Sequence, residues 1–140
     1  WVDAEQFSRI FREGRRAVPE QALPLLSRAE ALVEGEFLEG YQADWVEMAR
    51  PRWSEEVQQC RALLAEHFAG HGRHMLAVEV WKRVLHCDSC SEEGYRGLFQ
   101  AYRALSRQAE ALRLLQSCRQ AYRDQLDLEP PEEFERLAHF

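Results

Sequence analysis

The chain has 140 residues, of which 46% are hydrophobic and 30% charged, and its formal net charge is −6 at pH 7. This composition is typical of a globular protein that is soluble in water, and the length suffices for a hydrophobic core. No apolar run approaches the ~20 residues of a membrane span, so we expect no contact with a membrane. The chain opens without the basic and apolar regions of a signal peptide. We therefore expect a cytoplasmic fragment of a longer protein.

Apolar side chains at helical spacing predict helices along most of the chain, and no stretch shows the alternation of a β-strand. The first two helices are expected at 3–17 and 19–34 and form a pair. Residues 35–50 are an insert between the first and second pairs. Because this insert holds large apolar residues such as Phe37 and Tyr41, we expect it to pack across the first helix pair.

Two more helix pairs, 51–87 and 90–125, follow the insert. Their helices are expected at 51–69, 74–87, 90–105 and 108–125. Ser89 and Glu92 are three residues apart, which is the spacing of a capping box that would begin the third pair. Pro130 and Pro131 end that pair, and a short capping helix at 131–139 would cover the last apolar face.

Residues 58–118 repeat themselves after 34 residues. Seven positions agree in residue type: Leu64 with Leu98, Phe68 with Tyr102, Gly72 with Ser106, Ala77 with Ala111, Val78 with Leu112, Trp81 with Leu115 and Val84 with Cys118. Thirty-four residues is the length of the tetratricopeptide repeat (TPR), a helix–turn–helix unit. The small alanine lets the second helix approach the first closely, and the large residue one turn later fills the groove between them.

A less regular copy lies upstream, where Ala22, Leu26 and Ala29 repeat the spacing of the triplets that begin at Ala77 and Ala111. The sequence therefore predicts an all-α fold in a single domain, 1–140. We expect a TPR-like array of three antiparallel helix pairs plus a short C-terminal capping helix, with right-handed superhelical stacking.

Four stretches resemble a known family. Residues 2–7 read VDAEQF, 29–40 read AEALVEGEFLEG, 108–112 read QAEAL, and 126–130 read LDLEP. They are similar to four motifs of the bacterial transcriptional activator domain: D-x-x-x-F, A-L-x-x-Y-x-G-x-F-L-x-G, R-x-A-E-A-L and L-G-x-x-P. This is the TPR-like domain of streptomycete-type antibiotic regulatory proteins. The chain departs from the pattern at Asp127, where the family usually has Gly, and at Val33, which replaces an aromatic residue.

The resemblance implies a regulatory role. In that family the domain lies beside a winged-helix DNA-binding domain or within larger signalling regulators, and it contributes to self-association and protein contacts. We therefore expect a protein partner or self-association, and DNA binding only through a separate domain that this chain lacks. The alternative is a TPR adaptor or chaperone-like module, unrelated to transcription, that binds a peptide segment in its concave groove.

The chain offers little for chemistry. It has no Gly-rich phosphate loop. Cys87 and Cys90 have a C-x-x-C spacing, but a structural zinc site needs four ligands, and Cys60 and Cys118 fall on predicted buried stripes. We expect four reduced thiols and no enzyme activity, catalytic residue, cofactor or metal.

A peptide-binding groove would be lined by the first helix of each pair. The repeat register places six polar residues of candidate partner-binding role there: Gln59, Glu66, Glu93, Arg96, Gln100 and Arg103. Arg96 and Arg103 are seven residues apart on one helix face, where they could hold a carboxylate. Ordinary solvated charges are the simpler interpretation of these residues.

Charge is unevenly distributed along the chain. Residues 92–124 hold six arginines against four acids, which would give the last pair a modest basic face or an ordinary solvated surface. The arginines are spaced along two helices and interrupted by acids. This is too diffuse for a helix that reads a DNA groove, so we expect no DNA binding by this chain alone.

Overall fold

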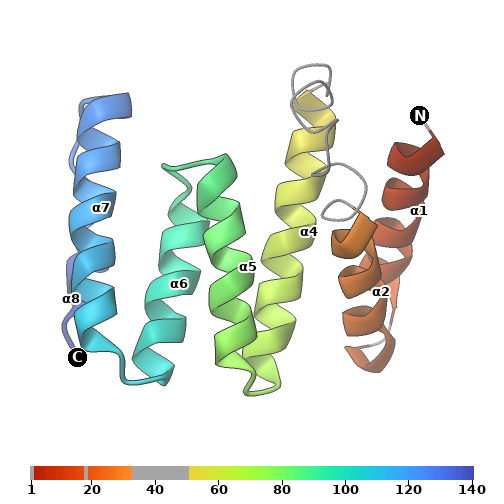
Figure 1. The fold of residues 1–140 in the computed structure, drawn as a ribbon, viewed down its shortest axis with the longest axis horizontal. Coiled ribbons are helices and arrows are strands. Elements are labelled where there is room, and N and C mark those ends of the chain that lie inside the picture. Colours follow the sequence, from red (N-terminus) through yellow and green to blue (C-terminus); the bar gives the residue numbers. More distant parts are fainter. Residues whose placement is uncertain (1, 18, 33–50) are drawn as a thin grey trace. The chain divides into compact units, whose positions relative to one another are not determined.

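The computed structural model describes residues 2–17, 19–32 and 51–140 (Figure 1). Within these ranges the chain is helical and has no strand, which confirms the predicted all-α fold. The helices are α1 Val2–Arg16, α2 Pro19–Leu32, α4 Pro51–Gly70, α5 His74–Cys87, α6 Glu92–Ala104, α7 Gln108–Leu126 and α8 Glu132–Ala138. The predicted packing of the insert 35–50 falls outside the described residues. The chain divides into two compact units, 1–64 and 65–140.

In the first unit, α1 packs along α2 through apolar side chains spaced one helical turn apart. Phe7 and Phe11 lie one turn apart on α1 and stack with ring centroids 5.9 Å apart, and both side chains are buried. Ala22, Leu26 and Ala29 of α2 are buried as well. The alanine-led triplet that defined the first repeat therefore faces the core, as its helical spacing predicts.

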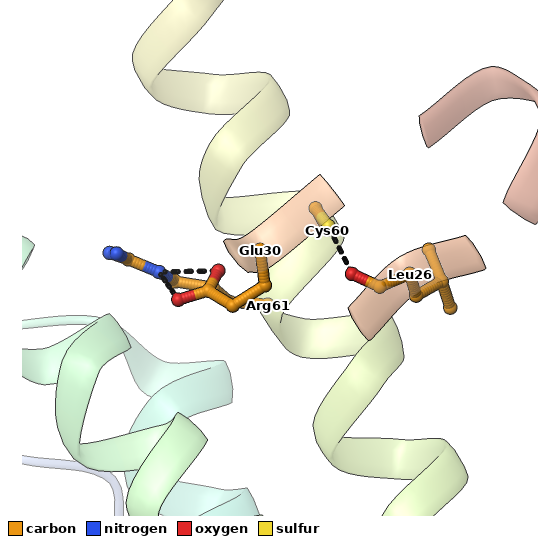
Figure 2. A network of polar contacts seen from close by, with 4 residues as sticks. All are labelled: Leu26, Glu30, Cys60 and Arg61. Atoms are coloured by element: carbon orange, nitrogen blue, oxygen red, sulfur yellow. Dashed lines mark hydrogen bonds and ion pairs between the residues drawn. The ribbon is translucent and has the colours of Figure 1, made fainter. Parts of the chain in front are cut away.

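The first unit also buries an ion pair, which Figure 2 shows. The Nε atom of Arg61 on α4 lies 3.1 and 3.0 Å from the two carboxylate oxygens of Glu30 on α2, and the two side chains are only 4% and 5% exposed. Next to this pair, the Cys60 thiol donates to the main-chain oxygen of Leu26 at 3.8 Å. Removing either charge would leave the other without its partner in a site with almost no water.

The second unit repeats one turn 34 residues apart, as the sequence predicts. The α4–α5 turn places Gly72 at φ 75°, and the α6–α7 turn places Ser106 at φ 56°. In the first turn the amide of Arg73 donates to the oxygen of Phe68 at 2.8 Å, and in the second turn Arg107 donates to Tyr102 at 2.9 Å. The two turns therefore share a left-handed residue and a hydrogen bond at equivalent positions.

Helices α5 and α6 pack closely because one position lacks a side chain. Trp81 of α5 is buried, and a Cβ atom added at Gly97 of α6 would lie only 2.1 Å from its ring. Ala77 and Ala111, the small residues of the two repeats, are 0% exposed. The register derived from the 34-residue repeat thus places small residues where helices meet.

Helix α8 covers one face of α6 and α7. Phe134 of α8 is fully buried, and its ring lies 5.9 Å from that of Tyr95 and 5.5 Å from that of Phe99. Asp127 allows the chain to leave α7 for α8, because it takes the left-handed conformation at φ 52°. The predicted capping helix is therefore present and packs through Phe134.

The start of α6 differs from the prediction. Ser91, not Ser89, is the N-cap, and its hydroxyl accepts the amide of Gly94 at 3.1 Å. The reason is a turn that precedes the helix, in which the amide of Cys90 donates to the side chain of Asp88 at 3.1 Å. Ser89 lies inside this turn, where its main-chain oxygen accepts the hydroxyl of Tyr95 at 2.7 Å.

Candidate functional site

Glu66 and Glu93 are two of the six residues predicted to bind a partner. Both are exposed residues of the second unit. The pKa of Glu66 is raised above its ordinary value of 4.5, first by partial burial and then by repulsion from Glu93. The structure therefore brings these two acids together. Gln59 is exposed in the first unit.

The three other predicted residues lie on α6. Gln100 and Arg103 are exposed. Arg96 is half-buried, and its Nε donates to a carboxylate oxygen of Glu133 on α8 at 3.0 Å. The carboxylate that Arg96 holds therefore comes from its own chain, and its predicted role towards a partner stays a prediction.

A pocket of about 390 Å³ lies on a different surface, between α5, α6 and α7. Helix α6 lies between the other two (Figure 1). Leu98 and Tyr102, one turn apart on α6, are almost fully buried and contribute to the apolar part of the lining. Leu85 of α5 and Leu114 of α7 are half-buried and add to it. The apolar part of the lining therefore comes from three helices.

Polar groups complete the lining: Lys82, Glu110, Arg113 and Ser117. Lys82 is the only lysine of the sequence, and both it and Arg113 are exposed. Glu110 accepts a hydrogen bond from Arg107 at 3.4 Å. Its charge is therefore offset by an arginine outside the pocket, while the two cations remain at the edge of an apolar surface.

The sequence did not predict this pocket, and none of the six predicted residues lines it. A helix advances 100° per residue, so Leu98 lies roughly 160° around α6 from Arg96. The pocket and the predicted surface are therefore on opposite sides of α6. Leu98 and Tyr102 were recognised only as repeat positions that match Leu64 and Phe68.

The cysteines show no sign of a reactive site. Burial is the main cause that raises the pKa of Cys60 and of Cys118 to about 12, so both thiols stay protonated and unreactive at neutral pH. Cys87 is exposed, and the Sγ of Cys90 lies 3.6 Å from the main-chain oxygen of Ala121. In the described ranges no three His, Cys, Asp or Glu side chains are grouped to hold a metal ion.

One comparison with known proteins decides the family. The model of the bacterial transcriptional activator domain matches residues 2–139. The chain belongs to this family. No curated protein and no solved structure matches it.

Membership in the bacterial transcriptional activator domain family accounts for two features of the chain. The left-handed Asp127 stands where the family motif usually has Gly, the residue best suited to that conformation. The activator domain is also all-α and TPR-like, as the resemblance implied. None of its described helices has the length and apolar character that crossing a membrane requires.

Proposed function

We propose that this activator domain is a protein-interaction and self-association domain of a bacterial transcriptional regulator, and that it does not itself bind DNA. Family membership supports the regulatory role over the alternative of a general peptide adaptor. Regulators of this kind need contacts with other proteins as well as with DNA. The proposal assigns the first task to this domain and the second to a separate domain.

One observation carries the proposal: the C-terminal glutamates pair with three of the six arginines of the third helix pair. Arg96 pairs with Glu133, and Arg119 and Arg123 lie 3.5 and 3.9 Å from carboxylate oxygens of Glu135 and Glu129. DNA affinity comes largely from cations that neutralise phosphates and release their counterions. Cations already paired with carboxylates contribute less, because the carboxylates repel the phosphates.

A fourth arginine of the pair, Arg107, is paired with Glu110, and the two that remain do not restore a DNA surface. Arg103 and Arg113 are ten residues apart on different helices, α6 and α7. A helix that reads DNA presents several side chains on one face, next to further phosphate contacts. Two separated cations on a chain of net charge −6 do not meet this requirement.

A titration of the 140-residue chain with a labelled DNA duplex, followed by fluorescence anisotropy at low salt, tests the proposal. We expect no binding at about 10 μM protein. An ordinary non-specific DNA-binding protein is largely bound at this concentration in low salt. The matched variant replaces Glu129, Glu133 and Glu135 by Gln. It should bind DNA more tightly than the parent, because it frees three arginines. Micromolar binding by the parent that weakens steeply with salt would contradict the proposal.

Analytical ultracentrifugation tests the interaction role. If the domain contacts a second copy of itself, it should self-associate without added DNA. A chain that stays monomeric and also captures no subunit or co-factor protein of its regulator would count against a protein-interaction role.

A further inference from the structure

The lining of the pocket between α5, α6 and α7 selects for an apolar ligand group. The half-buried Leu85 and Leu114 still expose part of their side chains, and the nearly buried Leu98 and Tyr102 lie with them in the lining. Water in contact with this surface would be released when an aliphatic side chain covers it, which favours binding. A volume of about 390 Å³ is at the lower end of ligand pockets. It suits one or two anchoring side chains.

The charges at the pocket select for an acid. Lys82 comes from α5 and Arg113 from α7, so positive charge reaches the pocket from two helices. Among the described residues neither cation forms an ion pair. The nearby arginines Arg107, Arg119 and Arg123 all pair with glutamates. In an acidic chain, two cations beside the pocket that form no ion pair with the described residues complement a carboxylate-bearing ligand.

A nucleic acid fits this pocket poorly. Single-stranded nucleic acid is bound largely through aromatic faces on which its bases stack. The one aromatic residue of the lining, Tyr102, is only 5% exposed.

We propose that the pocket binds an acidic amphipathic peptide segment of a partner protein. An aliphatic side chain of that segment covers Leu85 and Leu114, and its carboxylates pair with Lys82 and Arg113. This is the geometry of an amphipathic helix laid into an apolar groove with charges at the edge. The inference rests on the proposed interaction role and names the chemistry of the partner. The surface it uses is not that of Arg96 and Arg103.

The test is an anisotropy titration of the 140-residue chain with a fluorescein-labelled peptide of about twelve residues, with leucine one helical turn apart and glutamate between. We expect saturable binding. The double variant Lys82→Glu, Arg113→Glu should weaken it roughly tenfold or more, because attraction becomes repulsion at both sites. Arg136→Glu, which reverses the charge of an exposed residue on α8, is the matched control and should leave binding unchanged. Circular dichroism verifies that each variant folds.

Two changes to the peptide separate the apolar and the acidic contributions. Replacing its glutamates by glutamine should weaken binding to the parent but have little effect on binding to the double variant. Replacing its leucines by serine should weaken binding to both proteins, because the lining of the pocket is intact in each.

Three results would overturn the pocket assignment. The first is absence of peptide binding at millimolar concentration, and the second is a double variant that binds as tightly as the parent. The third is loss of binding by Arg103→Glu instead, which would place the ligand on the opposite side of α6 and leave the proposed interaction role intact. The proposed role fails separately, in the DNA titration and in ultracentrifugation.

Discussion

The Nε atom of Arg61 faces both carboxylate oxygens of Glu30, at 3.1 and 3.0 Å, in a site that is nearly closed to water. The pair joins α2 to α4, so it connects a helix of the first pair with a helix of the second. Each partner compensates for the buried charge of the other. The stability of the first unit should therefore respond very differently to the loss of one charge and to the loss of both.

The first prediction concerns this pair. Arg61→Leu should lower the free energy of unfolding by about 3–5 kcal/mol, because it removes the positive charge that faces the buried Glu30 carboxylate. The double variant Arg61→Leu, Glu30→Leu should recover most of that loss, because apolar residues of similar volume avoid the cost of burying charge. Urea unfolding measures both. Arg28→Leu, an exposed change on α2, is the control, and a double variant no better than the single one would contradict the prediction.

The second prediction concerns the contact of Gly97 with Trp81. Gly97→Ala should destabilise the fold by about 1–3 kcal/mol, because the added methyl group overlaps the buried ring. Helix propensity alone predicts the opposite, a gain of about 1 kcal/mol. Gly70→Ala has no neighbour within 4 Å and should be neutral or stabilising in the same thermal melts. In a Trp81→Leu background, the cost of Gly97→Ala should shrink; an unchanged cost would mean that the ring is not its cause.

The third prediction uses the two equivalent turns. Ser106 holds φ 56°, which costs a residue with a side chain roughly 1 kcal/mol, so Ser106→Gly should raise the stability by up to that amount. At the equivalent position, Gly72→Ala should lower the stability by about 1 kcal/mol through backbone strain alone, because open space surrounds the new Cβ. Equal melting temperatures for Ser106→Gly and the parent would argue against this account.

The fourth prediction concerns pH. Because the pKa of Glu66 is raised in the folded chain, the folded state binds this proton more tightly than the unfolded state does, and ionisation costs stability as pH rises through the raised pKa. Glu93→Gln removes a repelling charge, so it should lower the pKa of Glu66 towards 4.5. A carboxyl NMR titration measures the change. Glu79→Gln on α5 is the control and should leave the pKa of Glu66 where it was.

The corresponding stability measurement has a defined sign. At neutral pH, Glu66→Gln should unfold at a slightly higher urea concentration than the parent, because the variant carries no penalty for ionisation. The difference should disappear at acidic pH, where Glu66 is protonated in both states. A variant that is less stable than the parent at neutral pH would show that the Glu66 charge is favourable instead.

The repeat was predictable because its signal is local. Glycine and serine at positions 72 and 106 mark turns, and the alanine-led triplets follow from helical spacing, so no long-range information is needed. The start of α6 was predicted at the wrong serine. Ser89 and Ser91 are both residue types that cap helices, and only the turn at Asp88 decides between them. The residue types allow either serine to cap the helix, and the hydrogen bonds of the preceding turn make Ser91 the cap.

The buried ion pair and the pocket depend on how helices meet. Arg61 follows Val57 by four residues and Glu30 follows Leu26 by four, so helical spacing places both charges on buried faces. That signal was present, but arginine and glutamate are so often exposed that spacing alone did not outweigh their type. The pairing of Arg96 with Glu133 depends on where α8 lies, which no local pattern encodes. The pocket depends on the space between α5 and α7, which comes only from three helices packed together.

The position of α8 has a consequence for how the domain ends. Its seven residues put the Phe134 ring against Tyr95 and Phe99, on the surface where a further hairpin would stack. Without these seven residues, the aromatic rings would form an exposed apolar patch that another molecule can bind. Repeated head-to-tail contacts that do not close into a ring produce filaments. The short α8 helix thus covers an apolar surface to which further molecules could otherwise add.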